Sequence, residues 1–214
     1  MRTWMLVAAA GIAAAAAAAS PPARRYCLTW GASEQEAAEP LPGDDLLAGA
    51  AVQSTRAIAV GAEPWAVWPW LVQMGSGRGG AYTYDWIENL LGLDMHSADE
   101  ILPEFQKLAV GDVLPLGPED PRMRVEICDE NQSLVLRSTD GAWVWSFVLR
   151  PKDGGTRLIS RNRISPPDGR FYYDLVMAQG SLIMERKMLK GIRRRAEKLQ
   201  AAGPSALPRP AVSS

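Results

Sequence analysis

The chain is poor in histidine and cysteine and has almost no net charge, and each shortage excludes a class of function. His96 is the only histidine among the 214 residues, which excludes a multi-histidine metal site. The two cysteines, Cys27 and Cys128, form no CxxC motif and fit no zinc spacing, and two free thiols are favoured over a single disulfide. The formal net charge of -1 gives no global argument for binding nucleic acid. We therefore expect neither a metal site nor a nucleic-acid partner.

The glycine-rich stretch Gly75–Gly80 does not have the features of a phosphate-binding loop. It lacks a Gly-Lys-Ser/Thr ending, and it does not precede a helix in a βαβ unit. We expect a flexible turn there instead, at the mouth of a pocket. No cofactor is predicted from this sequence.

Residues 1–25 contain a long uncharged segment. No charged side chain occurs between Trp4 and Ala19, and most of this segment is alanine. A helix over residues 3–20 would reach roughly 27 Å, close to the hydrocarbon thickness of a bilayer, although alanine makes insertion only marginally favourable. We predict an N-terminal hydrophobic anchor or signal segment, and membrane contact through it.

Two interpretations of this segment stay open. As a cleaved signal peptide, Arg2 is its charged start and the alanines offer small-residue cleavage sites, so the domain is exported. As an uncleaved anchor, Arg24 and Arg25 keep the following domain in the cytoplasm by the positive-inside rule. We favour the anchor, since Pro21-Pro22 makes a poor start for a mature chain. The expected localisation is therefore membrane-anchored with a cytoplasmic domain.

The rest of the chain divides into a connector, one domain and a tail. Residues 26–51 contain Gly, Pro and acidic residues with little periodicity, and we expect an irregular connector that lies on the domain. Residues 52–200 are predicted to form the domain, and 47% hydrophobic residues are enough to build its core. Residues 201–214 are rich in Pro, Ala and Ser and are expected to be disordered.

The domain begins with a strand and two short helices. Residues 52–60 have the composition of a strand that ends at Gly61. Pro64 then starts a short helix with an apolar face, because the missing N–H of a proline has no consequence in a first turn. A second helix is predicted from Tyr84 to Leu91, and Gly92 is typical of a helix C-terminus.

The pattern then changes to the period of two that is typical of strands. Turn signals such as Asp140-Gly141 and Asp153-Gly154-Gly155 separate the segments, as in an antiparallel meander. The predicted strands are 111–116, 123–127, 133–137, 142–150 and 156–164.

The last predicted element is a long helix from Tyr172 to Gln200. Apolar residues recur along it at seven-residue intervals, which gives it a stripe that faces a sheet. The basic cluster Arg186–Lys198 lies mostly on the remaining surface. It fits contact with anionic headgroups, at about 1 kcal/mol per basic group, or an ordinary solvated helix face near the C-terminal dipole.

This order of elements, together with the run AVWPWLVQMG at Ala66–Gly75, resembles the helix-grip START-like superfamily, which is also called SRPBCC or polyketide cyclase/dehydrase-like. The resemblance covers residues 29–199, and it is stronger to a membrane-anchored bacterial group of the superfamily without assigned chemistry. Further matching blocks are Pro42–Asp45, Gly79–Asn89, His96–Asp99, Val110–Asp112 and Met184–Leu189.

The resemblance implies an α+β helix-grip fold. A curved antiparallel sheet of six or seven strands would wrap around the long C-terminal helix, with two short helices after the first strand. It implies no catalytic residues, because lipid carriers, hormone receptors and aromatic cyclases share the architecture. A strongly curved sheet that grips one helix leaves a gap, so we expect an internal apolar pocket.

Aromatic and arginine side chains are the candidate pocket residues. Trp143, Trp145 and Phe147 share one face of a predicted strand, and Tyr82 and Trp86 come from the helical region. These rings either line a pocket for a flat or lipid-like ligand or pack as ordinary core.

Arginines add a second set of pocket candidates. Arg137 and Arg161 either hold a ligand carboxylate on an inward face or lie on an outer solvated face.

His96 is the candidate for acid–base chemistry. It lies close in sequence to Asp94 and Asp99, and a histidine oriented by a carboxylate can act as a general base. The alternative is that these residues stabilise a loop. No serine or cysteine nucleophile has a recognisable motif, so the catalytic residues stay unassigned, and the sequence leaves open whether the chain is an enzyme.

The sequence favours binding of an apolar or amphipathic small molecule, lipid-like or aromatic, in an internal pocket near the membrane. One alternative is a cyclase or dehydratase that acts on a polyketide-like or aromatic substrate and uses His96. Another is a structural or interaction protein that uses the outer face of the sheet. The sequence assigns no oligomeric state.

Overall fold

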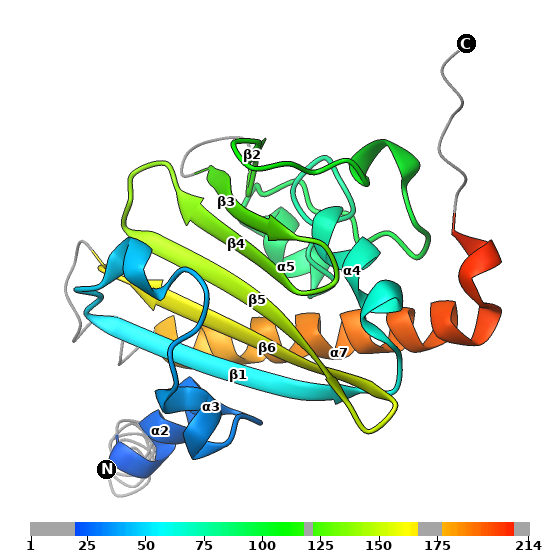
Figure 1. The fold of residues 1–214 in the computed structure, drawn as a ribbon. Coiled ribbons are helices and arrows are strands. Elements are labelled where there is room, and N and C mark those ends of the chain that lie inside the picture. Colours follow the sequence, from blue (N-terminus) through cyan, green and yellow to red (C-terminus); the bar gives the residue numbers. More distant parts are fainter. Residues whose placement is uncertain (1–19, 118–121, 167–176, 208–214) are drawn as a thin grey trace, which may run out of the picture.

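An antiparallel sheet grips one long helix (Figure 1). The structure is a computed structural model that describes residues 20–117, 122–166 and 177–207. Within these residues the sheet has six strands in the order β1-β6-β5-β4-β3-β2, and the 25-residue helix α7 (Ala178–Ala202) lies along its concave face. The strands are β1 (Val52–Val60), β2 (Val113–Leu114), β3 (Met123–Asp129), β4 (Ser133–Ser138), β5 (Trp143–Lys152) and β6 (Gly155–Ile164).

The predicted α+β helix-grip fold is confirmed by this topology. The first strand pairs with the last, β1 with β6, and the remaining strands follow as a meander from β6 back to β2. The chain passes through two short helices, α4 (Pro64–Val72) and α5 (Asp85–Leu90), before it returns to the sheet. Of the predicted long helix, residues 172–176 lie outside the described residues.

The concave face carries the main hydrophobic core. Trp145, Phe147 and Leu149 alternate along β5 with side chains that face outward, and they pack in one cluster with Leu189 and Ile192 of α7. The helix α4 covers one end of this face. All of its residues from Ala66 to Val72 are buried, and it packs against both α7 and the sheet. A helix that is enclosed on every side needs apolar residues on all of its faces.

A close approach between α7 and the loop before α5 depends on Gly191. A Cβ atom at this position would lie 2.7 Å from the main-chain oxygen of Tyr82, so only glycine fits here. Tyr82 is buried under the helix, and its hydroxyl donates to the main-chain oxygen of Trp70 over 2.9 Å. Burial raises the pKa of the Tyr82 phenol far above its ordinary value, so this hydroxyl stays a hydrogen-bond donor.

The connector contains more helix than predicted. It begins within α2 (Pro21–Thr29), and it continues through α3 (Glu34–Ala38) and the 3-10 turn η1 (Asp44–Leu47). The N-terminus of α3 has a capping box, in which Ser33 and Glu36 satisfy each other's main-chain N–H groups. The spacing Ser33-x-x-Glu36 is therefore a sequence signal for the start of this helix. The Gly, Pro and acidic residues of the segment had instead indicated an irregular connector. At the other end, residues 201–207 are also ordered, since α7 runs to Ala202 and η4 (Pro204–Ala206) follows.

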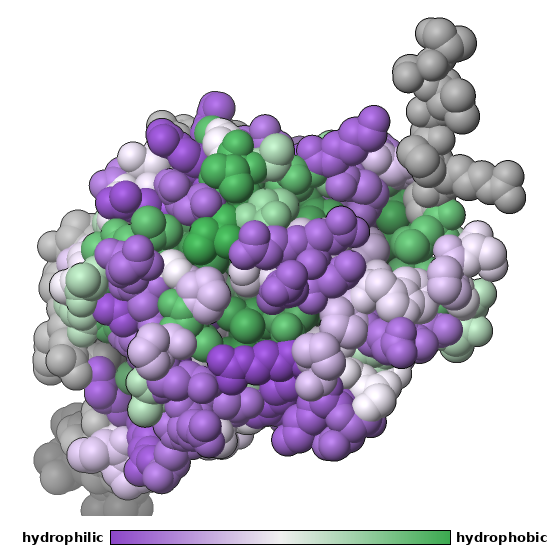
Figure 2. Space-filling model, in the orientation of Figure 1, coloured by the Kyte–Doolittle hydropathy of each residue, from purple (hydrophilic) through white to green (hydrophobic). Residues whose placement is uncertain are grey.

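Arg161 fastens the connector to the outer face of the sheet. The side chain is 1% exposed, and all five of its N–H donors have acceptors. These acceptors are Thr55 Oγ1, Asp44 Oδ2 and the main-chain oxygens of Glu36, Ala37 and Glu39. Burial lowers the pKa of the guanidinium, and the neighbouring Asp44 carboxylate opposes that shift. Figure 2 shows mainly hydrophilic residues over α3 and the β1 edge of this outer face.

We expect Arg161→Met to destabilise the protein by about 3–5 kcal/mol, because it leaves Asp44 and several carbonyl groups without their partner. Arg150→Met is the matched control, since Arg150 pairs with Glu39 on the same face but is 42% exposed. We expect it to cost about 1 kcal/mol or less. Urea denaturation measures both, and equal losses would contradict the role given to Arg161.

The stability that the docked connector contributes should depend on pH through Glu36. Two hydrogen bonds from Arg157 lower the pKa of this carboxyl from 4.5 to about 2. A carboxyl with a lowered pKa in the folded state stabilises that state fully above its ordinary pKa, and this contribution disappears as the pH falls through the folded value. The stability difference between wild type and Glu36→Gln should therefore be constant near pH 7 and shrink from about pH 4.5 to about pH 2.

Urea denaturation at several pH values measures this difference. Glu34→Gln is the control, since its carboxylate is 85% exposed and its pair with Arg25 is solvated. A Glu36→Gln difference that stays the same at pH 3 as at pH 7 would contradict the prediction.

Candidate functional site

Two adjacent rows of polar residues cross the concave face of the sheet, which is apolar elsewhere. In one row Ser54 of β1 lies opposite Asn162 of β6, and in the next Arg56 lies opposite Ser160. All four side chains are buried, with exposed fractions of 6% or less. We call these four residues, together with Glu185 of α7, the polar belt. The rows on either side are apolar again, with Val52 opposite Ile164 and Ile58 opposite Leu158.

An ion pair between the sheet and the helix lies at the centre of the polar belt. Arg56 Nη1 donates to Glu185 Oε2, and both side chains are buried. The other nitrogens of the guanidinium reach Ser181 Oγ at 2.8 Å and the main-chain oxygen of Cys27 at 2.9 Å. One arginine of β1 is therefore bonded to α7 and to α2 at the same time.

Two tryptophans extend the belt along the sheet. The rings of Trp143 and Trp145 are stacked, with centroids 5.4 Å apart and an interplanar angle of 20°. Trp143 Nε1 donates to Asn162 Oδ1 at 2.8 Å, and Trp145 Nε1 donates to Ser160 Oγ at 3.0 Å. Because Asn162 also donates to Glu185 Oε2 at 3.2 Å, the indoles are linked to the ion pair through hydrogen bonds.

Two polar atoms of the belt have no hydrogen-bond partner among the described residues. They are Glu185 Oε1 and Ser54 Oγ, and both are buried. A buried polar atom without a partner destabilises a fold by about 1–3 kcal/mol. A carboxylate oxygen accepts a hydrogen bond and a hydroxyl donates or accepts one, so together they can recognise a polar group that enters the interior.

The predicted aromatic pocket residues have different environments. Trp143, Trp145 and Phe147 all lie on the concave face, where Phe147 is fully buried and the partly exposed Trp143 lies at the edge of the core. Tyr82 is also buried, but its hydroxyl is occupied by Trp70. Trp86 is 69% exposed on α5 and does not face the interior. The structure therefore brings three of the five rings together on the sheet and places Trp86 outside.

The two predicted pocket arginines lie on the opposite, outer face. Arg137 is opposite Val144, which alternates with the inward-facing Trp143 and Trp145. Arg161 has no free donor for a ligand carboxylate, because all five of its donors hold the connector and the sheet. For both residues the outer-face interpretation is the one the structure supports.

His96 and its neighbouring carboxylates form no enclosed site. Its imidazole side chain is 75% exposed, and Nε2 lies 3.1 Å from Asp94 Oδ1, which is equally exposed. Asp99 points elsewhere, and its carboxylate pairs with Arg195 of α7 at 2.7 Å. The alternative in which these residues stabilise a loop therefore fits their placement, and the cyclase or dehydratase hypothesis loses its proposed base.

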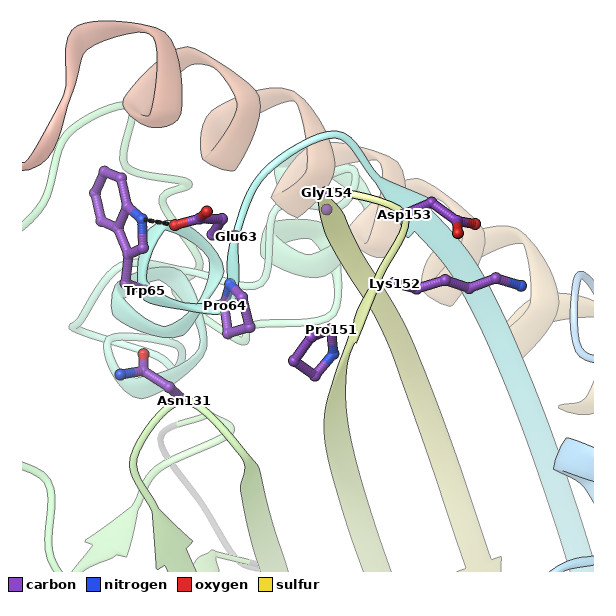
Figure 3. A pocket seen from close by; sticks show the side chains of 9 residues that line it. Glu63, Pro64, Trp65, Asn131, Pro151, Lys152, Asp153 and Gly154 are labelled. Carbon is purple, nitrogen blue, oxygen red and sulfur yellow. Dashed lines mark hydrogen bonds between the residues drawn. The ribbon is translucent and has the colours of Figure 1, made fainter.

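An open pocket of about 600 Å³ lies at the β5–β6 hairpin, at the opposite end of β5 from Trp143. Figure 3 shows the residues that line it. The start of α4, the β3–β4 turn and the β5–β6 hairpin form its walls, and the Trp65 side chain is bonded to Glu63 beside it. No residue of the polar belt and no pocket residue predicted from sequence lines it. Its lining residues are Glu63, Pro64, Trp65, Asn131 and Pro151–Gly155.

Within residues 20–117, 122–166 and 177–207, no three His, Cys, Asp or Glu side chains are placed to hold a metal ion. No helix in the same ranges has both the length and the apolar character of a membrane span, and the predicted segment Trp4–Ala19 lies outside them. Both Cys27 and Cys128 are free thiols.

Sequence reasoning missed Arg56, Asn162 and Glu185, although the two charged residues each left a signal. Arg56 shares its strand parity with the core residues Ile58 and Val60, so it interrupts an apolar face. Glu185 lies three residues after Leu182 and four before Leu189, on the apolar stripe of the long helix. A charged residue at a core position on each of two packed elements indicates a buried pair.

No protein-family model matches the chain, and no curated protein matches it. Among solved structures, the chain is similar to the KanY protein, with 15% identity, 68% of this chain and 97% of that chain covered, and a TM-score of 0.47. A Chromobacterium violaceum protein has 12% identity, coverages of 68% and 98%, and a TM-score of 0.46. A Polyketide_cyc-like protein from Corynebacterium glutamicum has 19% identity, coverages of 70% and 90%, and a TM-score of 0.35.

With identities of 12–19% and TM-scores below 0.5, these likenesses carry no argument for a family or a function. The helix-grip fold that the sequence resemblance implied is confirmed by the strand order and by the position of α7.

The role of the Arg56–Glu185 pair can be tested with a double-mutant cycle. Arg56→Met and Glu185→Leu should each destabilise the protein by about 3–5 kcal/mol, because each leaves a buried charge without its partner. The double variant should lose less than either single variant, since it replaces both charges by apolar side chains. Urea denaturation measures the coupling.

The exposed pair Arg193–Glu197, at 3.9 Å and one helical turn apart, serves as the matched control cycle. We expect a coupling of about 0.5 kcal/mol or less there. If the losses at Arg56 and Glu185 simply add, the two side chains do not stabilise each other.

Proposed function

We propose that the domain binds one amphipathic small molecule on the concave face of its sheet. The polar group of the ligand contacts the polar belt, and its apolar body lies against the stacked Trp143 and Trp145. The observation that carries the proposal is that two buried atoms of the belt, Glu185 Oε1 and Ser54 Oγ, have no partner among the described residues, while Asn162 links Glu185 to the Trp143 indole. A ligand that bonds to both atoms removes the two unfavourable terms of the free protein.

The stability of the fold does not by itself explain why the residues of the polar belt are polar. A buried ion pair is on average no more stabilising than well-packed apolar residues of similar size, because both charges lose their hydration. The next row of the same strands, Ile58 and Leu158, packs against α7 without any polar group. Since an apolar row suffices there to hold the helix on the sheet, we attribute the polar rows to recognition.

The belt selects the chemistry of the ligand. Glu185 Oε1 accepts a hydrogen bond, so it favours a hydroxyl, an N–H group or an ammonium group. A carboxylate ligand is disfavoured, because it would lie beside the Glu185 carboxylate in a poorly solvated interior. The indole faces of Trp143 and Trp145 favour a flat or lipid-like body. The ligand class is therefore neutral or cationic, with a hydrogen-bond donor on an apolar ring or chain.

The two alternatives from the sequence have less support. The enzyme hypothesis required His96 in the interior, and this side chain is at the surface. The interaction hypothesis uses the outer face of the sheet, and part of that face is covered. The connector packs there over β1, β6 and β5, fastened by Arg161 and Arg157.

The ligand chemistry predicts a difference between two aromatic probes of similar shape. We expect 2-naphthol to bind at least about tenfold more tightly than 2-naphthoate, because the first brings a donor to Glu185 and the second brings a charge of the same sign. Ser54→Ala should weaken naphthol binding about two- to tenfold, which is the range of one hydrogen bond. Isothermal titration calorimetry at pH 7 measures these affinities.

Ser146→Ala is the matched control for Ser54→Ala. Ser146 is equally buried but lies on the outer face, where its hydroxyl donates to the main-chain oxygen of Pro42 over 2.8 Å. This change should leave naphthol binding as it is in the wild type. The proposal would be rejected by naphthoate binding as tightly as naphthol, or by Ser54→Ala and Ser146→Ala having the same effect.

A further inference from the structure

We propose that α5 and the adjacent basic side of α7 form a docking surface for an anionic lipid membrane. Three large apolar side chains lie exposed at α5, with exposed fractions of 69% for Trp86, 79% for Leu90 and 70% for Leu91. Trp86 and Leu90 are four residues apart, so they share one face of the helix. This apolar surface does not overlap the polar belt, and the inference does not rest on the proposed function.

A row of cations runs along α7, and its first member lies against the residue that precedes α5. Lys187, Lys190, Arg194 and Lys198 follow at spacings of three and four residues, which puts them along one side of the helix. The Lys187 ammonium lies 5.3 Å from the ring centroid of Tyr84, the residue that precedes α5. We call these four residues the basic ridge. Within the described residues none of the four forms an ion pair, so their charges are available to an outside partner.

Most carboxylates of the neighbouring segment are already occupied or turned inward. Asp85 accepts from both the main-chain N–H and the hydroxyl of Ser97, and Asp99 is paired with Arg195. Glu88 is buried on the inner side of α5, and burial raises its pKa. Asp94 and Glu100 remain exposed on the loop. The surface is therefore cationic along the basic ridge, with the partly exposed Glu197 of α7 paired with Arg193 beside it, apolar at α5 and mixed beyond it.

This combination fits a membrane surface better than a protein partner. Tryptophan and leucine on one side with lysine and arginine on the other are typical of elements that lie in the interface of a bilayer. Three side chains cover far less than the roughly 1,000 Å² that a stable protein interface needs. Shallow insertion requires no such area, because the basic ridge adds attraction to anionic headgroups.

Quenching of Trp86 fluorescence by brominated lipids tests the proposal in the full chain. The signal is the difference between wild type and Trp86→Phe, so insertion of the segment that contains Trp4 does not contribute to it. We expect Trp86 to be quenched in vesicles with one-third phosphatidylglycerol in phosphatidylcholine. In pure phosphatidylcholine the half-saturating lipid concentration should be at least about 25-fold higher.

Charge-reversal variants test the basic ridge. Lys190→Glu with Arg194→Glu should raise the half-saturating lipid concentration by about 25-fold or more, at about fivefold per basic group lost. Lys107→Glu with Lys152→Glu has the same change in net charge away from the ridge and should shift it by less than about threefold.

Three results would each overturn the proposal. These are no quenching of Trp86 in anionic vesicles, equal quenching in neutral vesicles, or equal effects of the two charge-reversal pairs. Leu90→Ser with Leu91→Ser adds an independent check by gel filtration without lipid. A change in the size of the particle would identify the apolar face as a contact between protein chains and would count against membrane docking.

Discussion

The guanidinium of Arg56 lies fully buried between the sheet and α7, and it is bonded to segments far apart in the sequence. Its partners are the main-chain oxygen of Cys27, Ser181 and Glu185. A buried guanidinium without partners is strongly unfavourable, so the position of α7 and the docking of α2 are coupled through one side chain. Arg161 has the same role on the opposite face of the same strand pair, where it holds the connector. Each face of the sheet thus depends on one buried arginine.

The sequence predicted the elements of the fold better than it predicted which face of each strand points outward. Strands and the long helix have periods and turn signals, and most predicted strand bounds and the predicted end of the helix were close to those observed, while its predicted start lies outside the described residues. The faces of β6 were not predictable, because Arg157, Arg161 and Arg163 alternate with residues of mixed polarity on the other side. Only the position of the connector, which brings Asp44 to Arg161, decides which side is outward. The short connector helices were missed because tertiary contacts rather than length stabilise them.

The candidate site was predicted in part. An aromatic strand face was expected to meet the interior, and Trp143, Trp145 and Phe147 do lie on the concave face. The composition of β5 does not reveal that the Ser54–Asn162 and Arg56–Ser160 rows beside it are polar, because these rows depend on the register between β1 and β6. Trp86 was assigned to the pocket because an aromatic residue in a short apolar helix resembles core. Six residues are too few for a periodicity that distinguishes a buried face from an exposed one.

The cations of α7 differ in whether they have a partner within the described part of the chain. Arg195 faces inward, and its pair with Asp99 and its bond to the main-chain oxygen of Ala98 fasten the loop after α5. Lys190 and Arg194 are exposed and have no such partner within the described residues. The helix dipole favours cations only within the last turn. Because α7 ends at Ala202, both residues lie at least two turns before that end. Neither internal pairing nor the dipole accounts for them, which leaves two reasons for their charge: an ordinary solvated helix face, or the proposed attraction to an anionic membrane.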